Sequence, residues 1–200
     1  MTIADVKDPK ETLSRTDEWR GALFGMVTEE IEAGGTRVTR NYLEHPGAVA
    51  VVALDDQGRV VLINQYRHAV RARLWEIPAG LIDYVGEDYL EAAKRELAEE
   101  TELAADSWHV LVDMFSSPGC SNESVRIFLA RDLHSVETDF VREGEEAEMT
   151  MDVVDLDEAA DAVLDGRIHS PSAIAGLLAA VRARESNWES LRPADAPWLR

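Results

Sequence analysis

Cysteine and positive charge are both scarce in this chain of 200 residues. The single cysteine, Cys120, has no partner for an intramolecular disulfide, so other interactions must hold the fold together. Lysine and arginine number 20 against 39 aspartates and glutamates, which gives a formal net charge of −19. A surface this acidic cannot release counterions from polyanions, so we expect neither nucleic acid nor anionic membrane as a partner.

Long apolar runs are absent as well. No run approaches the roughly 18 residues that a membrane-spanning helix requires. Residues 1–10 do not show the charged and then apolar pattern of a leader. We therefore expect a cytoplasmic protein with no membrane partner, long enough to bury one sizeable core beside an accessory element.

The stretch from Gly80 to Leu103 is the most informative part of the sequence. Good helix formers predict a helix over Tyr89–Leu103. At about 100° per residue, Leu90, Ala93 and Leu97 form its apolar stripe. That stripe predicts which face of the helix packs on the core.

Three carboxylates share the neighbouring face of this helix. Glu96, Glu99 and Glu100 stand at spacings of three and four residues, where like charges repel. One interpretation is an ordinary solvated acidic face. The other is a site for Mg²⁺ or Mn²⁺, because these hard cations prefer oxygen ligands.

The surrounding residues favour the second interpretation. The run Trp75-Glu76-Ile77-Pro78-Ala79 leads into the stretch, whose spaced residues together resemble the Nudix box of Nudix hydrolases: Gly80, Glu87, Arg95, Glu96, Leu97, Glu99, Glu100 and Leu103. Six residues, 81–86, separate the glycine from the first glutamate, one more than the family pattern has. Glu102 replaces the usual glycine before the last apolar residue, which leaves the end of the helix open.

The resemblance implies a metal site. Glu96 and Glu100 match the positions that bind the divalent ions, Glu99 matches a further or water-mediated ligand, and the carbonyl of Ala79 matches another. Arg95 is expected to orient a glutamate such as Glu87 through a charge-assisted hydrogen bond; without the motif it would be a surface helix residue.

A base must take a proton from the attacking water. In the ADP-ribose pyrophosphatase branch of the family this role belongs to a glutamate on a loop after the Nudix helix. The matching segment contains Glu145 and Glu146, of which we favour Glu145. An ordinary acidic turn in a very acidic protein is the alternative.

The same branch supplies the expected substrate contacts. Its signature resembles Gln65-Tyr66-Arg67 followed by the run containing Glu76, so Arg67 and Glu76 are expected to contact the substrate. Arg67 would bind phosphate or ribose, with a surface salt bridge as the alternative. Pro118 and Gly119 match its proline mark but also suit any turn. Phe24 lies where the branch places an aromatic that stacks on adenine, and is otherwise a core residue.

Strands and helices alternate irregularly along the rest of the chain. We expect strands around glycine turns from Trp19, a hairpin from Pro46, an acidic loop over Val141–Met149, a strand over Thr150–Val154, and helices over Asp157–Leu164 and Ser172–Arg184. This order predicts an α+β fold, which the resemblance identifies as the Nudix fold, an α/β/α sandwich with a mixed sheet and a small N-terminal β-sheet element.

Three segments follow from this order. Residues 1–45 are expected to form the N-terminal sheet element, residues 46–184 the catalytic domain, and residues 185–200 an irregular tail. The N-terminal sheet has too little core to stand alone. In the family such a sheet exchanges between subunits, which implies a homodimer with contacts on the adenine side.

The sequence therefore predicts metal-dependent hydrolysis of ADP-ribose to AMP and ribose 5-phosphate. Two alternatives stay open: a pyrophosphatase for another nucleoside diphosphate sugar, and a non-catalytic Nudix module that binds a nucleotide sugar. Intact Glu96, Glu99 and Glu100 weigh against the second.

Overall fold

The structure is a computed structural model that describes residues 3–82, 84 and 86–200, so Asp83 and Val85 of the longer Nudix loop lie outside it. It divides into two compact units. The first contains the described residues up to Gly47 together with 115–124 and 197–200, and the second contains residues 48–114 and 125–196. In the described residues no helix is long and apolar enough to cross a membrane.

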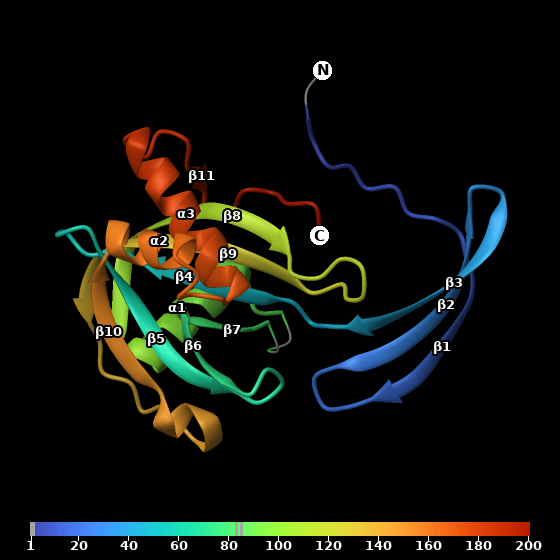
Figure 1. Ribbon diagram of the computed structural model, residues 1–200, viewed down its shortest axis with the longest axis horizontal. Coiled ribbons are helices and arrows are strands. Elements are labelled where there is room, and N and C mark those ends of the chain that lie inside the picture. The colour runs from blue at the N-terminus through green and yellow to red at the C-terminus, as the bar shows by residue number, and fades with distance from the viewer. Residues whose placement is uncertain (1–2, 83, 85) are drawn as a thin grey trace. The chain divides into compact units, whose positions relative to one another are not determined.

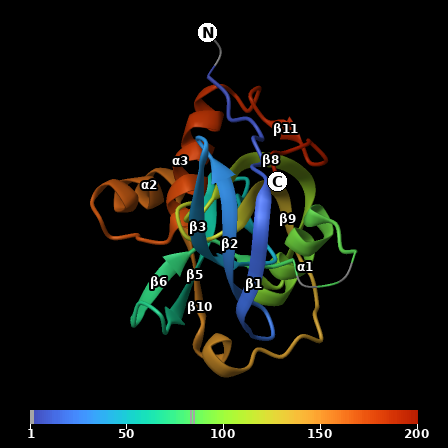
Figure 2. The same cartoon turned by 90° about the vertical axis from the view of Figure 1, so that its right-hand side faces the viewer.

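The first unit contains a three-stranded antiparallel sheet in the order β1-β2-β3 (Figure 2). Its strands are β1 (Thr12–Arg20), β2 (Gly25–Ala33) and β3 (Thr36–Glu44). The sequence predicted strands only from Trp19, which was wrong: the polar β1 starts earlier because it is held by its backbone pairing with β2. Every residue of β1 is exposed, so the sheet buries little core of its own.

The second unit carries a five-stranded and a three-stranded sheet (Figure 1). The larger sheet has the order β11-β8-β9-β4-β7, with bounds Arg192–Pro193, Leu103–Phe115, Ser124–Ser135, Ala48–Ala53 and Ala79–Leu81. The smaller has the order β10-β5-β6, with bounds Thr150–Asp155, Arg59–Arg67 and Ala72–Glu76. Strand β4 pairs parallel with β9 and antiparallel with β7, which makes the larger sheet mixed as expected.

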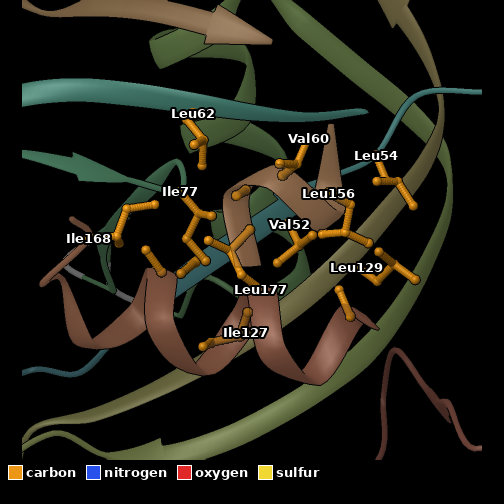
Figure 3. Packing of buried hydrophobic residues seen from close by; sticks show 14 of the residues in the cluster. Val52, Leu54, Val60, Leu62, Ile77, Ile127, Leu129, Leu156, Ile168 and Leu177 are labelled. Carbon is orange, nitrogen blue, oxygen red and sulfur yellow. The ribbon is translucent and has the colours of Figure 1, made fainter. Parts of the chain in front are cut away.

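Strand β4 lies at the centre of two cores because its side chains alternate. Val49 and Val51 face a cluster that includes residues of helix α1 (Tyr89–Thr101). Val52 faces the cluster in Figure 3, to which α2 (Leu156–Leu164) and α3 (Pro171–Glu185) contribute. An apolar strand that is buried on both faces is typical of a sheet covered on each side. The expected α/β/α sandwich is therefore present.

Two further predictions from sequence need correction. The predicted acidic loop contains a short 3-10 turn, η1 (Gly144–Glu148), which lies against β5. The predicted irregular tail contributes β11, which pairs with β8. Both elements are held by contacts with distant parts of the chain, so local sequence carries little signal for them.

The helix that contains the carboxylates ends earlier than predicted, at Thr101 and not at Leu103. Glu102 takes the left-handed conformation with φ 56°, and its N–H donates to the carbonyl of Ala98. A left-handed residue is the usual stop for a helix and is normally glycine, because a Cβ is strained there. The glutamate thus performs the glycine's role at a cost.

Replacing this residue tests that cost. Glu102→Gly is expected to raise the free energy of unfolding by about 0.5–1 kcal/mol, because the strain of a left-handed L-residue disappears. Urea unfolding followed by circular dichroism measures the change. Glu102→Ala keeps a Cβ and is the matched control. A gain in the alanine variant equal to that in the glycine variant would show that the side-chain charge, and not the backbone, is responsible.

Candidate functional site

Helix α1 presents its acidic residues at the edge of a buried face. Asp88 caps its first turn by accepting a hydrogen bond from the N–H of Leu90. Ala92, Ala93 and Leu97 are fully buried. Leu90 of the predicted stripe is only half-buried, because Ala92 takes the central place in the core.

Glu100 is a strongly perturbed carboxylate of this helix. Its side chain is only 6 % exposed. Burial is the main cause that raises its pKa to about 8, and the charges of Glu96 and Glu146 raise it further. The backbone N–H of Ala79 donates to its Oε2 at 2.8 Å and acts in the opposite direction, as does the charge of Arg67.

Arg95 gathers the other carboxylates. Its guanidinium donates to both oxygens of Glu87 at 3.0 Å each, so the predicted contact between these two residues is present. The same side chain donates to Glu96 at 2.6 Å and to Glu99 at 3.1 Å. The ring of Tyr84 lies 4.6 Å from its Cζ. The hydrogen bonds with Glu87 and the charge of Glu96 raise the pKa of Arg95, and the guanidinium offsets the repulsion among the three carboxylates.

Gly80 lets strand β7 pass directly beside the carboxylate of Glu96. A Cβ built on this glycine would lie 1.9 Å from Cδ of Glu96. Any side chain at this position would push the carboxylate away or move the strand. The glycine of the box is therefore required by close approach and not by its backbone conformation.

The residues around Glu100 fit a divalent cation. A buried carboxylate beside two other negative charges is strained by their repulsion, and a cation would remove it. In the described part of the chain, however, no three acidic, histidine or cysteine side chains already surround one point. The hydrogen bonds explain this: Arg95 holds Glu96 and Glu99, and Ala79 holds Glu100.

Arg67 and Glu76 form a pair at the end of strand β5. Nε and Nη2 of Arg67 donate to the two carboxylate oxygens of Glu76 at 3.1 and 2.7 Å. Glu76 is buried and also accepts a hydrogen bond from Gln65 at 3.3 Å. The predicted substrate arginine is thus oriented by a buried carboxylate and lies near enough to Glu100 to lower its pKa.

The loop after β9 brings further negative charge to the site. Glu146 is partly buried in η1, and its charge acts on Glu100. The side chain of Glu145, the favoured base, lies outside the described part of the structure. The effect of Glu146 on Glu100 therefore shows that this loop lies close to the acidic helix, which the sequence did not predict.

The remaining predicted contacts belong to the first unit. Phe24 stacks on the ring of His45, with centroids 4.9 Å apart. Pro118 and Gly119 line a pocket of about 420 Å³ together with residues of β2 and β3. The loop that contains them is tied to β3 because the N–H of Leu43 donates to the carbonyl of Cys120 at 2.9 Å. The stacking of Phe24 on adenine and the contact of Pro118 and Gly119 with the substrate stay predictions.

Comparison with known proteins agrees with this geometry. The family model of the NUDIX domain matches residues 44–174, which include every residue of the carboxylate cluster. The chain belongs to the Nudix family. It is 45% identical over 190 residues to an ADP-ribose pyrophosphatase of Mycobacterium tuberculosis, covering 94% of this chain and 91% of that protein.

Two further similarities support the family and the fold. An ADP-ribose pyrophosphatase of Bacillus subtilis is 33% identical over 129 residues, which cover 64% of this Nudix hydrolase and 69% of that protein. A solved ADP compounds hydrolase superposes with a TM-score of 0.76 at 21% identity, covering 92% of this chain and 98% of that one. At this identity the second similarity supports the Nudix fold alone.

Sequence reasoning missed two arginines of this Nudix hydrolase that anchor the loop around η1 to the rest of the second unit. Arg142 donates to the carbonyl of Glu100 at 2.8 Å, and Arg73 donates to the carbonyl of Glu148 at 2.5 Å. One signal was available, since Arg142 is the only lysine or arginine in the sequence from residue 136 to residue 149. A lone cation in an acidic segment is a candidate anchor.

The raised pKa of Glu100 predicts a pH-dependent stability. The folded state holds this proton more tightly than the unfolded state, so between pH 4.5 and about 8 the metal-free protein is expected to lose stability as pH rises. The loss should be on the order of a few kcal/mol. Urea unfolding in a chelator at several pH values measures it.

Glu100→Gln is the control, because the amide cannot ionise. The difference in unfolding free energy between wild type and this variant isolates Glu100 from histidines that titrate in the same range. Added divalent ion should reverse the loss in the wild type alone. Equal pH slopes in both proteins would contradict the assignment.

Proposed function

We propose that this Nudix hydrolase cleaves the diphosphate of ADP-ribose to AMP and ribose 5-phosphate, using Mg²⁺ or Mn²⁺. The observation that carries the proposal is the buried Glu100 carboxylate beside Glu96 and Glu146, within a chain 45% identical to a protein named for this activity. The alignment covers 94% of the chain, so it includes both units and not the Nudix box alone.

The metal ligands proposed are the carboxylates of Glu96, Glu99 and Glu100 with the carbonyl of Ala79. A divalent ion bound there would neutralise diphosphate oxygens and stabilise the leaving phosphate. Hard oxygen donors of this kind suit Mg²⁺ and Mn²⁺. Arg95, which donates to Glu96 and Glu99, fixes where these two carboxylates stand.

Substrate binding and proton transfer are assigned to side chains outside the metal site. Arg67, oriented by Glu76, is proposed to donate hydrogen bonds to the diphosphate or a ribose oxygen. A glutamate of η1, Glu145 or Glu146, is proposed to take the proton of the attacking water. Phe24, Pro118 and Gly119 are proposed to contact the nucleoside and ribose ends of the substrate.

A homodimer is also proposed, as in the resembling family. It is supported by the fully exposed β1, since a three-stranded sheet with so little core gains stability by packing on a partner. Light scattering gives the mass in solution, and a monomer at all concentrations would exclude it.

The substrate is tested by a panel of diphosphates with purified protein and Mg²⁺. ADP-ribose is expected to be hydrolysed with the highest kcat/KM, above GDP-mannose and diadenosine polyphosphates, and Mn²⁺ is expected to replace Mg²⁺. Product analysis should give AMP and ribose 5-phosphate in equal amounts. Preference for another nucleotide sugar would correct the substrate, whereas tight binding of ADP-ribose without turnover of any compound would make the chain a binding module.

The base is tested by two single variants. The favoured assignment expects Glu145→Gln to lower kcat by about 10²–10⁴-fold. Glu146→Gln should then have a smaller effect, through its charge near Glu100. Rate measurements across pH 5 to 9 should show the acidic limb, the rise in rate as the base loses its proton, lost in the base variant only. A normal rate in Glu145→Gln with a collapse in Glu146→Gln would transfer the role to Glu146.

A further inference from the structure

The C-terminal end of helix α1 is closed by contacts that include the loop leading to η1. The last carbonyls of a helix lack partners within it. Here the carbonyl of Ala98 accepts from the N–H of Glu102 at 2.9 Å. The carbonyl of Glu100 is served from a distance, by Nη2 of Arg142 at 2.8 Å.

A second contact fixes the start of the same loop. The N–H of Val136 donates to the carbonyl of Glu102 at 3.0 Å. The segment from 136 to 142 is therefore attached to the end of α1 at both of its ends. A guanidinium at a helix C-terminus is also favoured by the helix dipole.

Arg142 stands just before the turn that carries the candidate base. Only four peptide units separate it from Glu146, so their Cα atoms lie within roughly 14 Å of each other. Glu146 is also close enough to Glu100 for its charge to act there. Thus Glu100 contacts the loop in two ways, through its carbonyl to Arg142 and through its carboxylate to the charge of Glu146.

The far end of η1 is held as well. Arg73 of β6 donates to the carbonyl of Glu148 and, at 3.3 Å, to its carboxylate. Met149 follows and is only 8% exposed. Figure 1 shows the turn in orange at the start of β10. The turn is therefore fixed on both sides, and Arg142 provides the contact that attaches it to helix α1.

We infer that Arg142 is a positioning residue that holds the η1 glutamates in register with the carboxylates of α1. The inference rests on the proposed function. Without the guanidinium, the acidic segment from Glu143 to Glu146 would be repelled by the acidic face of α1. Arg73 would still hold the far end of η1, but no other lysine or arginine of residues 136–149 would hold its near end. Loop and helix would move apart, and the base would lose its distance to the water.

Kinetics of Arg142→Ala and Arg142→Lys test this. The alanine variant is expected to lose about 10- to 100-fold in kcat, because small misplacements of a reacting group are costly, with KM changed less than about threefold. Lysine should restore part of kcat, since an ammonium can also donate to the carbonyl of Glu100. Arg182→Ala, which removes an exposed arginine paired only locally with Glu185, is the matched control and should behave as wild type.

A double-variant cycle separates positioning from simple support. The background is a protein in which both Glu145→Gln and Glu146→Gln are present. If Arg142 acts through the loop base, adding Arg142→Ala to this background should lower the residual kcat by less than about twofold. An undiminished loss in that background, or a matching shift in the Mg²⁺ concentration for half activity, would show that Arg142 acts on the metal ligands and would overturn the inference.

Two outcomes remain to be separated. A normal kcat in Arg142→Ala beside an active wild type overturns the inference alone, whereas an inactive wild type overturns the proposed function. If the alanine variant does not fold, Arg142→Gln takes its place; it should fold, keep one donor for the carbonyl and lose part of kcat. A normal kcat in a folded Arg142→Gln variant would overturn the inference that the guanidinium of Arg142 positions the loop.

Discussion

The burial of one carboxylate, that of Glu100, is the constraint on which the site depends. Its side chain is 6% exposed and accepts a hydrogen bond from the N–H of Ala79. This bond joins helix α1 to strand β7. The carbonyl of Glu100 accepts from Arg142, which joins the same helix turn to the loop before η1. A buried charge is costly unless it is compensated, so the N–H of Ala79, the charge of Arg67 and a bound cation would together have to offset burial and the charges of Glu96 and Glu146.

Local cations decide what this very acidic chain can bind. A net charge of −19 repels a diphosphate at long range, but that repulsion is screened within about 10 Å at moderate salt. At contact distance the arrangement is different: Arg67 is fixed by Glu76, and Arg95 by three carboxylates. The rigid arginines, together with the cation proposed for Glu96 and Glu100, would therefore offset much of the negative charge that the surrounding carboxylates bring to the site.

Sequence predicted the parts of the fold that depend on local pattern. The period of α1 predicted the buried positions of Ala93 and Leu97, and the resemblance to the Nudix box decided between the two interpretations of its acidic spacing. Helices α2 and α3 start and end within one residue of their predicted bounds. It missed β1, whose polar residues become a strand only through pairing with β2. It also missed Arg142, whose partner is 42 residues away, because no periodicity reports such a contact.

The residues proposed for the chemistry and those proposed for specificity belong to different units of the chain. The carboxylates, Arg67 and η1 belong to the second unit, whereas Phe24, Pro118 and Gly119 belong to the first. Groups that bind only the non-reacting ends of a substrate raise the rate insofar as their binding energy is used to orient the diphosphate. If the proposed contacts hold, the first unit bears on which nucleotide is hydrolysed, and the geometry around Glu100 bears on whether hydrolysis occurs at all. This division is why the Nudix box identifies the reaction and leaves the substrate to residues outside it.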